Sequence, residues 1–304
     1  MKKRNGPPGA GTEIGIEEHQ RVLKEGIDVP EQPPALSLPI QTVGIESNML
    51  WVDLPQGRLA FDASIYLCLP AEFRGIHMSR IEEAVSRSYH ESYPDLKAFA
   101  RTLASRILSR QRGGKIEISL SGLIPIARRA PVSQKESVES LKVFLHLIRG
   151  EGDEQMELGI EIEHMTACPC TQAYHDTLLE GAGSPLPLPT HSQRTITRFF
   201  VNDRLDRLDF EQLLTPAEES LHIIQGLLKR PDEAELVLKA HRRPQFVEDV
   251  VRELAASAGR RLSDRIDPDA TVRIESTSIE SIHTHNVVAR LKIPFRKILA
   301  LVGA

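Results

Sequence analysis

The chain has 304 residues, which at about 150 residues per domain allows either one large domain or an internal duplication. Its 40% hydrophobic and 26% charged residues are typical of a globular protein with a sizeable core, so collagen-like and coiled-coil classes are excluded. The formal charge of −4 argues against a general polyanion binder, because nonspecific nucleic-acid affinity needs clustered cations. We therefore expect no nucleic-acid partner.

Cysteine content and the first residues indicate the compartment. Three cysteines are too few for a disulfide framework and favour a reducing environment. Cys68 lies in an apolar strand pattern, so we expect it in the core. The basic start, residues 1–4, is followed by Gly and Pro, and no run approaches the roughly 20 apolar residues that span a bilayer. These features predict a cytoplasmic protein without a membrane partner.

The first elements along the chain follow an arm, residues 1–38, in which Gly, Pro, Glu and Lys show no sustained apolar period. The next segment, 39–152, is predicted to contain two strands, two helices and two strands. Its first helix begins with the capping box Ser79-Arg80-Ile81-Glu82, and its second follows Pro94. The strands are expected near 43–54, 59–70, 116–120 and 143–147.

The same order of elements recurs in 153–304. One helix is expected from the capping box Thr215-Pro216-Ala217-Glu218 to about residue 229, and another from Pro244 to Gly259. The strands are expected near 156–162, 195–201, 271–279 and 287–293. The predicted fold is therefore α+β, with ββααββ occurring twice and a helix pair on one face of each antiparallel sheet.

Three connections of the second unit are expected at one end of its sheet. They are the first hairpin loop, the helix–helix connection and the last hairpin loop, near 166–192, 230–245 and 280–286. Cys168 and His191 lie in the first loop, and a thiolate with an imidazole suits zinc or ferrous iron. The other segments add carboxylates and imidazoles, among them Glu233, Glu248 and His283, so an open metal site is plausible.

Each of these residues also has a structural interpretation. A Cys-x-Cys pair is a weak metal signal, and a lone histidine such as His283 is more often a surface loop residue. Glu233 and Glu248 stand where helix starts favour carboxylates. The convergence of the three connections at one end favours the functional interpretation. Phosphate-loop, dinucleotide-binding and His-Glu-x-x-His motifs do not occur in the sequence.

Seven motifs in series resemble GTP cyclohydrolase I of type IB, a metal-dependent family that opens the guanine ring of GTP. Their order is that of the family, and together they span most of the chain after the arm. The motifs are Gly75-Ile76-His77-Met78-Ser79-Arg80, Arg129-Ala130-Pro131-Val132-Ser133, Cys168-Pro169-Cys170, His191-Ser192-Gln193-Arg194, Leu228-Lys229-Arg230-Pro231-Asp232-Glu233, Phe246-Val247-Glu248-Asp249 and Glu280-Ser281-Ile282-His283.

The resemblance implies a bimodular tunnelling fold and a homotetramer with sites near subunit boundaries. It also implies hydrolytic opening of GTP with release of formate, giving 7,8-dihydroneopterin triphosphate for tetrahydrofolate synthesis. It implies Cys168, His191 and Glu233 as ligands of one Fe²⁺, Zn²⁺ or Mn²⁺ ion, with Cys168 also counted as catalytic. It implies Glu248 as the guanine-binding carboxylate and His283 as the proton-transfer residue. Candidates for the triphosphate are Arg80, Arg129, Lys135 and Arg194.

Three alternatives stay open at this point. The segment 181–189 lengthens the first loop and resembles the archaeal branch of the family, which implies 7,8-dihydroneopterin 2′,3′-cyclic phosphate for methanopterin synthesis. A tunnelling-fold protein that binds a purine or pterin without turnover is a second alternative. The third is a closed structural metal site formed by Cys168, Cys170, His191 and a carboxylate.

Overall fold

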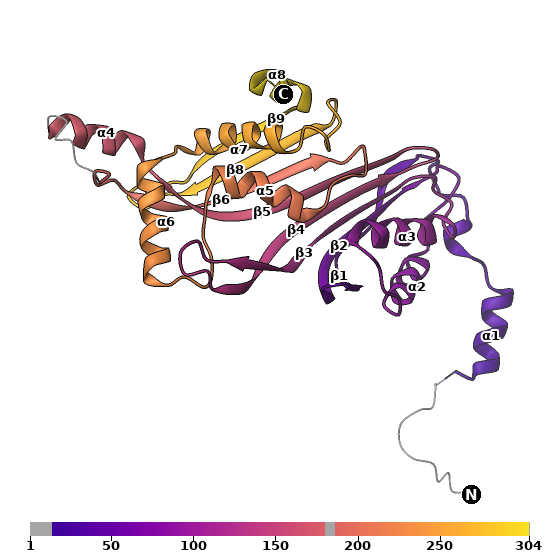
Figure 1. Ribbon diagram of the computed structural model, residues 1–304. Coiled ribbons are helices and arrows are strands. Elements are labelled where there is room, and N and C mark those ends of the chain that lie inside the picture. Colours follow the sequence, from indigo (N-terminus) through magenta and orange to yellow (C-terminus); the bar gives the residue numbers. More distant parts are fainter. Residues whose placement is uncertain (1–13, 180–185, 304) are drawn as a thin grey trace, which may run out of the picture.

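The computed structural model describes residues 14–179 and 186–303 as one α+β structure (Figure 1). Its elements in chain order are α1 (Ile16–Glu25), the short 3₁₀ helix η1 (Val29–Glu31), β1 (Ile40–Leu54), β2 (Gly57–Leu69), α2 (Met78–Ser88), α3 (Leu96–Leu108), β3 (Ile116–Arg129), β4 (Glu136–Arg149), β5 (Glu154–Ala167), α4 (Pro169–Leu178), β6 (Ser192–Asn202), α5 (Phe210–Ser220), β7 (His222–Ile223), α6 (Arg230–Arg242), α7 (Val247–Arg261), β8 (Thr271–Ile279), β9 (Val287–Pro294) and α8 (Phe295–Val302).

All described strands belong to one antiparallel sheet of the order β1-β2-β3-β4-β5-β6-β8-β9, and the short β7 pairs with β5. The pairing of β4 with β5, from Lys142↔Glu161 to Arg149↔Glu154, joins the two predicted four-stranded sheets into one. The fold class and the repeated ββααββ order are confirmed. The division of the chain after residue 152 stays a prediction.

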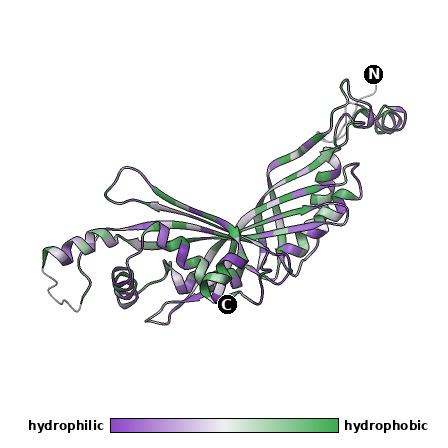
Figure 2. Cartoon of the chain, turned by 90° about the horizontal axis from the view of Figure 1, so that it is seen from above, coloured by the Kyte–Doolittle hydropathy of each residue, from purple (hydrophilic) through white to green (hydrophobic). Residues whose placement is uncertain are grey.

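One face of the sheet carries the helices and the hydrophobic core. Side chains of a strand point alternately to its two faces, and hydrophobic and hydrophilic residues alternate along the strands (Figure 2). In β5, Met156, Leu158, Ile160 and Ile162 are buried, and α5 packs against this strand. The core is continuous through both units, so the helix-covered face is common to the whole sheet.

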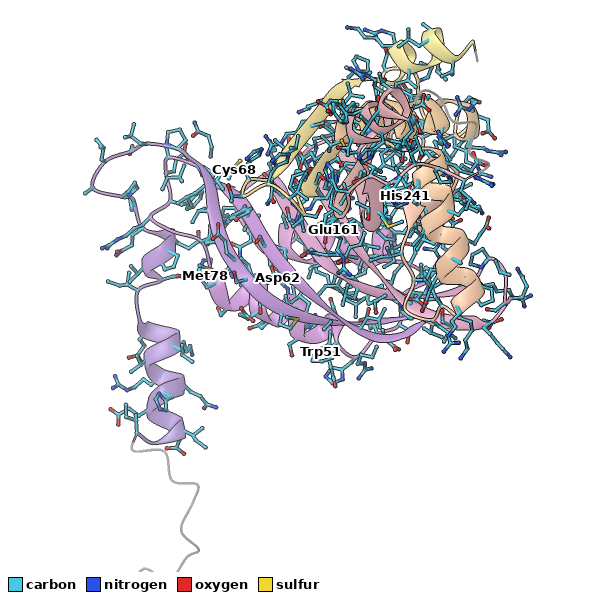
Figure 3. The ribbon with its side chains drawn as sticks, turned by 90° about the vertical axis from the view of Figure 1, so that its left-hand side faces the viewer. Trp51, Asp62, Cys68, Met78, Glu161 and His241 are labelled. Carbon is cyan, nitrogen blue, oxygen red and sulfur yellow. The ribbon has the colours of Figure 1, made fainter. Side chains whose placement is uncertain are left out.

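Cys68 occupies the other face, so its predicted place in the core is wrong. It alternates with the buried Leu67 and Leu69 of β2, is half-buried, and donates its thiol hydrogen to Gln41 O at 3.2 Å (Figure 3). Trp51 lies on the outer strand β1 and is 52% exposed. The apolar pattern of β2 does not distinguish the two faces there, because both are partly covered.

The junction of the two units is reinforced on the helix-free face. Phe144 of β4 and Phe200 of β6 meet across β5 with ring centroids 5.4 Å apart. Gly159 lies between them, and a Cβ there would be 2.2 Å from a carbon of the Phe200 ring. Gly159 therefore leaves the space that lets the aromatic pair bridge β4 and β6.

Two predicted helix starts are wrong because other residues stand at the N-cap, Asp209 in α5 and His77 in α2. α5 begins at Phe210, where Asp209 and Gln212 form a reciprocal capping box, and Pro216 lies inside the helix. It ends at Ser220, so the predicted extension to residue 229 is also wrong. α2 begins with His77 as its N-cap, and no side chain caps it.

α6 was expected as a connection and is a helix. Pro231 stands near its start, and the backbone N–H of Lys229 donates to the Asp232 carboxylate at 2.9 Å. The same carboxylate accepts the N–H groups of Val132 and Ser133 at 2.8 Å each, which fixes the start of α6 against the β3–β4 loop. Burial alone would raise the pKa of Asp232, but hydrogen bonds from Ser133, Lys229 and Val132 outweigh it and hold the pKa below its usual range.

Helices α1, α4 and α8 were also not expected from the sequence. α1 and α4 have no buried residue, so no apolar stripe marks them. Within the described residues, no helix is both long and apolar enough to cross a membrane.

Candidate active site

The ends of three neighbouring strands form one edge of the fold. Ala167 at the end of β5 pairs with Ser192 at the start of β6, and Arg194 pairs with Ile279 at the end of β8. Cys168, His191 and the 280–286 hairpin therefore lie together, as predicted for the first and last hairpin loops. We call this edge the cysteine end.

The alternation of side chains places several of these residues on the helix-covered face. Thr166, Thr195 and Ser278 are buried on that face. The same alternation continues to the rim of the sheet. Cys168 follows Thr166 by two residues, and Glu280 follows Ser278 by two. Gln193 and His191 precede Thr195 by two and four residues. The candidate site is thus the rim of the helix-covered face.

Backbone contacts join Cys168 to His191. The N–H of Cys168 donates to His191 O at 3.0 Å, and the Thr190 hydroxyl donates to Cys168 O at 2.7 Å. The Thr171 hydroxyl contacts the Cys168 sulfur at 3.8 Å. Cys168 is also the N-cap of α4, where the helix dipole favours negative charge. These contacts hold the backbone of Cys168 beside that of His191.

Two further imidazoles lie beside His191. Its ring meets that of His283 edge-on, with centroids 6.3 Å apart, and His283 stacks on His285 at 5.3 Å. His191 is half-buried, whereas His283 and His285 are exposed. An exposed imidazole next to a bound substrate can take up and release protons near neutral pH.

The start of α7, which carries Glu248, lies close to the end of β5. The N–H of Gln245 donates to Ala167 O at 3.1 Å, which fixes the segment before α7 against the end of β5. Gln245 is buried, and its amide also donates to Ser220 O. Glu248 follows in the first turn of α7, exposed at the positive end of the helix dipole.

Glu233 is not gathered with Cys168 and His191 in the single chain. The far end of α6 contacts the cysteine end, since the Gln172 amide donates to His241 O at 2.8 Å. Glu233 lies eight residues earlier, about 12 Å along the helix axis, beside the β3–β4 loop. Its side chain is exposed there.

Arg194 and Arg80, two of the four candidates for the triphosphate, also lie apart from this rim. Arg194 alternates to the helix-free face, pairs with Glu163 at 3.0 Å, and lines a cavity of ≈ 550 Å³ where β4 and β5 diverge. Arg80 belongs to α2, at the opposite end of the strands, and donates to Arg110 O at 2.7 Å. β5 has 14 residues, so the two ends are roughly 45 Å apart along the strands.

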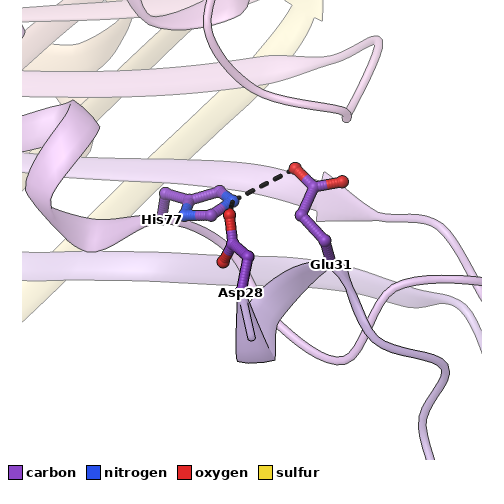
Figure 4. Close-up of side chains that lie close together, drawn as sticks. All are labelled: Asp28, Glu31 and His77. Carbon is purple, nitrogen blue, oxygen red and sulfur yellow. Dashed lines mark hydrogen bonds and ion pairs between the residues drawn. The ribbon is translucent and has the colours of Figure 1, made fainter. Parts of the chain in front are cut away.

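That opposite end holds a second group of metal-ligand types, which we call the arm cluster. Asp28, Glu31 and His77 bring their ligand atoms within 4.8 Å of one another, and no other such trio occurs in residues 14–179 and 186–303 (Figure 4). The imidazole Nε2 of His77 lies 3.2 Å from Glu31 and 3.7 Å from Asp28. These three residues could hold a metal ion.

Two guanidinium groups already contact the arm cluster. Glu31 pairs with Arg112 at 3.3 Å and with Arg80 at 3.8 Å. The hydrogen bond from His77, together with Arg112, outweighs burial and lowers the pKa of Glu31. η1, which carries Glu31, is also held by its backbone, since Pro30 O accepts the N–H groups of Arg74 and Gly75. The cluster thus fixes the described part of the arm to the β2–α2 loop.

Beneath the cysteine end the core is polar. His164 is fully buried, and its Nε2 bonds the Thr197 hydroxyl at 2.8 Å, which in turn bonds Ser276 at 2.9 Å. Thr166 and Thr195 bond each other at 2.8 Å. Burial lowers the pKa of His164 to about 3. His164 is therefore neutral in the fold.

Sequence reasoning missed the roles of Gln193 and Glu280. The side-chain oxygen of Gln193 faces His191 Nδ1 at 3.1 Å as an acceptor, and its amide nitrogen donates to Glu280 at 3.4 Å. Gln193 lies two residues after His191, and Glu280 lies two residues after Ser278. In a strand, this spacing puts each pair on one face, and it could have predicted the contacts. The lengthened segment 181–189 lies mostly outside the described residues.

Solved structures with a similar fold define the class of protein. A hyper-thermostable uricase mutant aligns with a TM-score of 0.54 at 8% identity, covering 86% of this chain and 94% of that one. Uricase from Arthrobacter globiformis aligns with a TM-score of 0.51 at 9% identity, over 84% and 93%. The chain thus has the tunnelling fold, as the resemblance implied.

Sequence comparison identifies the family. A family model described as type I GTP cyclohydrolase folE2 matches residues 27–289. GTP cyclohydrolase FolE2 of Nitratidesulfovibrio vulgaris is 33% identical over 273 residues, covering 87% of this chain and 95% of that protein. GTP cyclohydrolase MptA of Methanoregula boonei is 31% identical over 86% and 89%, and MptA of Thermoplasma acidophilum is 29% identical over 87% and 94%. The chain belongs to the type I GTP cyclohydrolase family, a family of hydrolases.

Proposed function

We propose that the protein opens the guanine ring of GTP by hydrolysis, releases formate and yields 7,8-dihydroneopterin triphosphate for tetrahydrofolate synthesis. The observation that carries the proposal is the shared rim of Cys168, His191, Glu248 and His283 in a member of this family. The residues come from β5, the start of β6, α7 and the β8–β9 hairpin. Each matches one chemical need of the reaction.

Cys168 and His191 are proposed as ligands of one divalent ion. Sulfur and imidazole donors on adjacent backbone suit Fe²⁺, Zn²⁺ or Mn²⁺, so the residues fit the group that the family implies. A bound ion would supply Lewis-acid activation of the water that attacks C8 of the purine. Thr171 and the start of α4 hold the Cys168 sulfur in place.

Glu248 is proposed to select guanine. Its carboxylate has two acceptor oxygens, and guanine presents two donors side by side, the ring N1–H and the exocyclic amine. Adenine presents an acceptor at N1, which would face the carboxylate unfavourably. Exposure at the start of α7 leaves the Glu248 carboxylate accessible to a base.

His283 is proposed to protonate N7 as C8 is attacked and to move protons while formate leaves. General acid–base catalysis by an imidazole typically contributes 10²- to 10⁴-fold, roughly 3 to 5 kcal/mol. The stacked His285 and the edge-on His191 limit the orientation of the His283 ring. The His283 ring therefore lies next to the ring of His191, the proposed metal ligand.

Glu233, Arg80 and Arg194 are proposed to complete the site in a homotetramer. Arg80 lies at the opposite end of the strands from Cys168, so a neighbouring subunit would have to supply it. We propose the same origin for Glu233, the third metal ligand, because it is exposed beside the β3–β4 loop.

We also propose a cytoplasmic location from the cysteine content. A reducing compartment of this kind keeps the Cys168 thiol reduced.

A second product is favoured by one observation. Two of the relatives named above, from Methanoregula boonei and Thermoplasma acidophilum, are named MptA. The second candidate is therefore the same ring opening with 7,8-dihydroneopterin 2′,3′-cyclic phosphate as product, in methanopterin synthesis. The two products differ in mass and in phosphate content.

Anaerobic incubation with GTP and each of Fe²⁺, Zn²⁺ and Mn²⁺ tests the proposal. Formate release with a fluorescent pterin after oxidation is expected, and mass analysis of the product distinguishes triphosphate from cyclic phosphate. His283→Asn should lose activity, while His285→Asn, its stacked neighbour, serves as the matched control. GTP or pterin binding without formate under all three metals would instead identify a non-catalytic binding protein and overturn the proposal.

A further inference from the structure

A chain of hydrogen bonds leads from His191 to the end of β8. Gln193 bonds the Nδ1 atom of His191 through its side-chain oxygen at 3.1 Å. The amide nitrogen of Gln193 donates to Glu280 at 3.4 Å, and the Ser278 hydroxyl donates to the same Glu280 oxygen at 2.8 Å. The chain thus joins the start of β6 to the end of β8.

The carboxylate at the far end fixes the direction of every bond. An ionised carboxylate only accepts hydrogen bonds, so the Gln193 group facing Glu280 must be the donor NH₂. The Gln193 group facing His191 is then the carbonyl oxygen, which only accepts. A neutral His191 must therefore carry its hydrogen on Nδ1, and the lone pair remains on Nε2.

We propose that Gln193 and Glu280 are positioning residues that hold His191 as the Nδ1–H tautomer and present its Nε2 to a divalent metal ion. The tautomer follows from the hydrogen bonds alone, whereas the metal part rests on the proposed function. Partners that orient a metal-binding histidine in this way typically contribute 10- to 100-fold to metal affinity.

The sheet makes the hydrogen-bond chain rigid. Gln193 precedes the buried Thr195 on β6, and Glu280 follows the buried Ser278 on β8, with Thr195 paired to Ser278 in the register. Gln193 thus belongs to β6 and Glu280 directly follows the end of β8, and both continue the alternation of the helix-covered face. Positioning by strands costs less conformational entropy at the moment of metal binding than positioning by a free loop.

The tautomer is measured first, on metal-free protein. Protein labelled with ¹⁵N only in its histidine rings is studied by solid-state NMR at about pH 8, where free imidazoles are neutral. His191 is identified by the signal that His191→Gln removes. The Nδ1–H form is expected for the parent protein, and an Nε2–H form would overturn the proposal. This measurement does not depend on GTP turnover.

Zinc affinity is measured next, by competition with a chelating dye. Gln193→Ala should weaken binding about 10- to 100-fold and mix the two tautomers. Glu280→Gln still offers an oxygen to the Gln193 amide, so it should stay near the parent, whereas Glu280→Ala should weaken binding. Unchanged tautomer and affinity in Gln193→Ala would overturn the proposal.

A paired exchange separates positioning from general damage. Gln193→Glu places two carboxylates opposite each other and should lose affinity. Adding Glu280→Gln restores a donor facing an acceptor, so the double variant should recover both affinity and the Nδ1–H form. If the parent protein releases formate but these variants change neither the zinc affinity nor the His191 tautomer, this inference is refuted and the proposed function stands. The reverse pattern, tautomer and affinity effects without turnover, would refute the proposed function alone.

Discussion

The two ends of the sheet both gather metal-ligand types, but with opposite surroundings. In the arm cluster, Asp28, Glu31 and His77 already lie within 4.8 Å of one another, and Arg80 and Arg112 contact Glu31. At the cysteine end, the His191 ring is held by the neutral amide of Gln193. Two carboxylates offset by two guanidinium groups offer a dication little net attraction. Charge balance, more than closeness of ligand atoms, therefore separates the two ends.

Removing the sulfur at the cysteine end should have the largest effect. Cys168→Ala should lower bound metal and reduce formate release by about 100-fold or more, because a ligand of the activating ion is lost. Metal analysis and the formate assay measure this. Cys170→Ala, an exposed neighbour in α4, is the matched control and should keep both.

Metal analysis of an arm-cluster variant tests which of the two ends binds the metal ion. His77→Ala should leave the metal content of the protein unchanged. Loss of metal in His77→Ala, with Cys168→Ala unaffected, would place the metal in the arm cluster and reverse the assignment.

Mixed assemblies test whether the two ends meet between subunits. Arg80→Ala and Cys168→Ala should each be inactive alone. Co-expressed in equal amounts, they should recover activity in about a quarter of the sites, since a site then combines intact parts of two chains. Purified mixed assemblies, separated by two different tags, are assayed for formate. No recovery would mean that both residues act within one chain, or that Arg80 has no part in the site.

Acid should destabilise the polar core beneath the cysteine end. The pKa of His164 is lowered to about 3 in the fold, against about 6.5 in an unfolded chain, so the unfolded state binds a proton first as pH falls. Between pH 6.5 and 4.5 this should cost roughly 2 to 3 kcal/mol of unfolding free energy. Urea denaturation at both pH values measures the loss.

His164→Gln is the variant for that measurement, because it keeps a hydrogen-bonding amide for Thr197 but does not titrate. Its stability should fall less on acidification than that of the parent protein. An equal loss in both would assign the acid sensitivity to other groups.

The smallest effect is expected at the arm cluster. Since the pKa of Glu31 is lowered in the fold, its contribution is present above pH 4.5 and is lost as pH falls below that value. Glu31→Gln should speed amide exchange in the segment Val29–Gln32 and leave the thermal midpoint nearly unchanged. Hydrogen-exchange mass spectrometry at neutral pH measures this, with Glu17→Gln on the exposed α1 as control. Equal exchange in both variants would mean that the backbone bonds of Pro30 alone hold the arm.

Much of the fold could be predicted because hydrophobic period follows burial. The predicted bounds, 271–279 for β8 and Pro244 to Gly259 for α7, are close to the observed ones, since every second residue of β8 is buried and α7 buries a regular set of mostly apolar residues. α6 could not be found in this way. Its buried residues are Asp232 and Ala240, and the bonds that fix its start come from a loop 100 residues away in sequence.

The site was predictable in residue types and only partly in placement. The antiparallel order brought Cys168, His191 and His283 together as expected. The direction of the Gln193 bond depends on the register of β6 against β8, which no local pattern encodes. Glu233 and Arg80 were implied by the family resemblance, and resemblance does not tell which chain of an assembly supplies a residue.

The pairing of β4 with β5 also affects how such a protein is built from its parts. Two separate ββααββ units would have to form such a joint by collision, and the joint could dissociate. Here both strands belong to one chain, and Phe144 and Phe200 stiffen their pairing over Gly159, so the effective concentration of one unit at the other is very high. The two units therefore stay paired at any protein concentration.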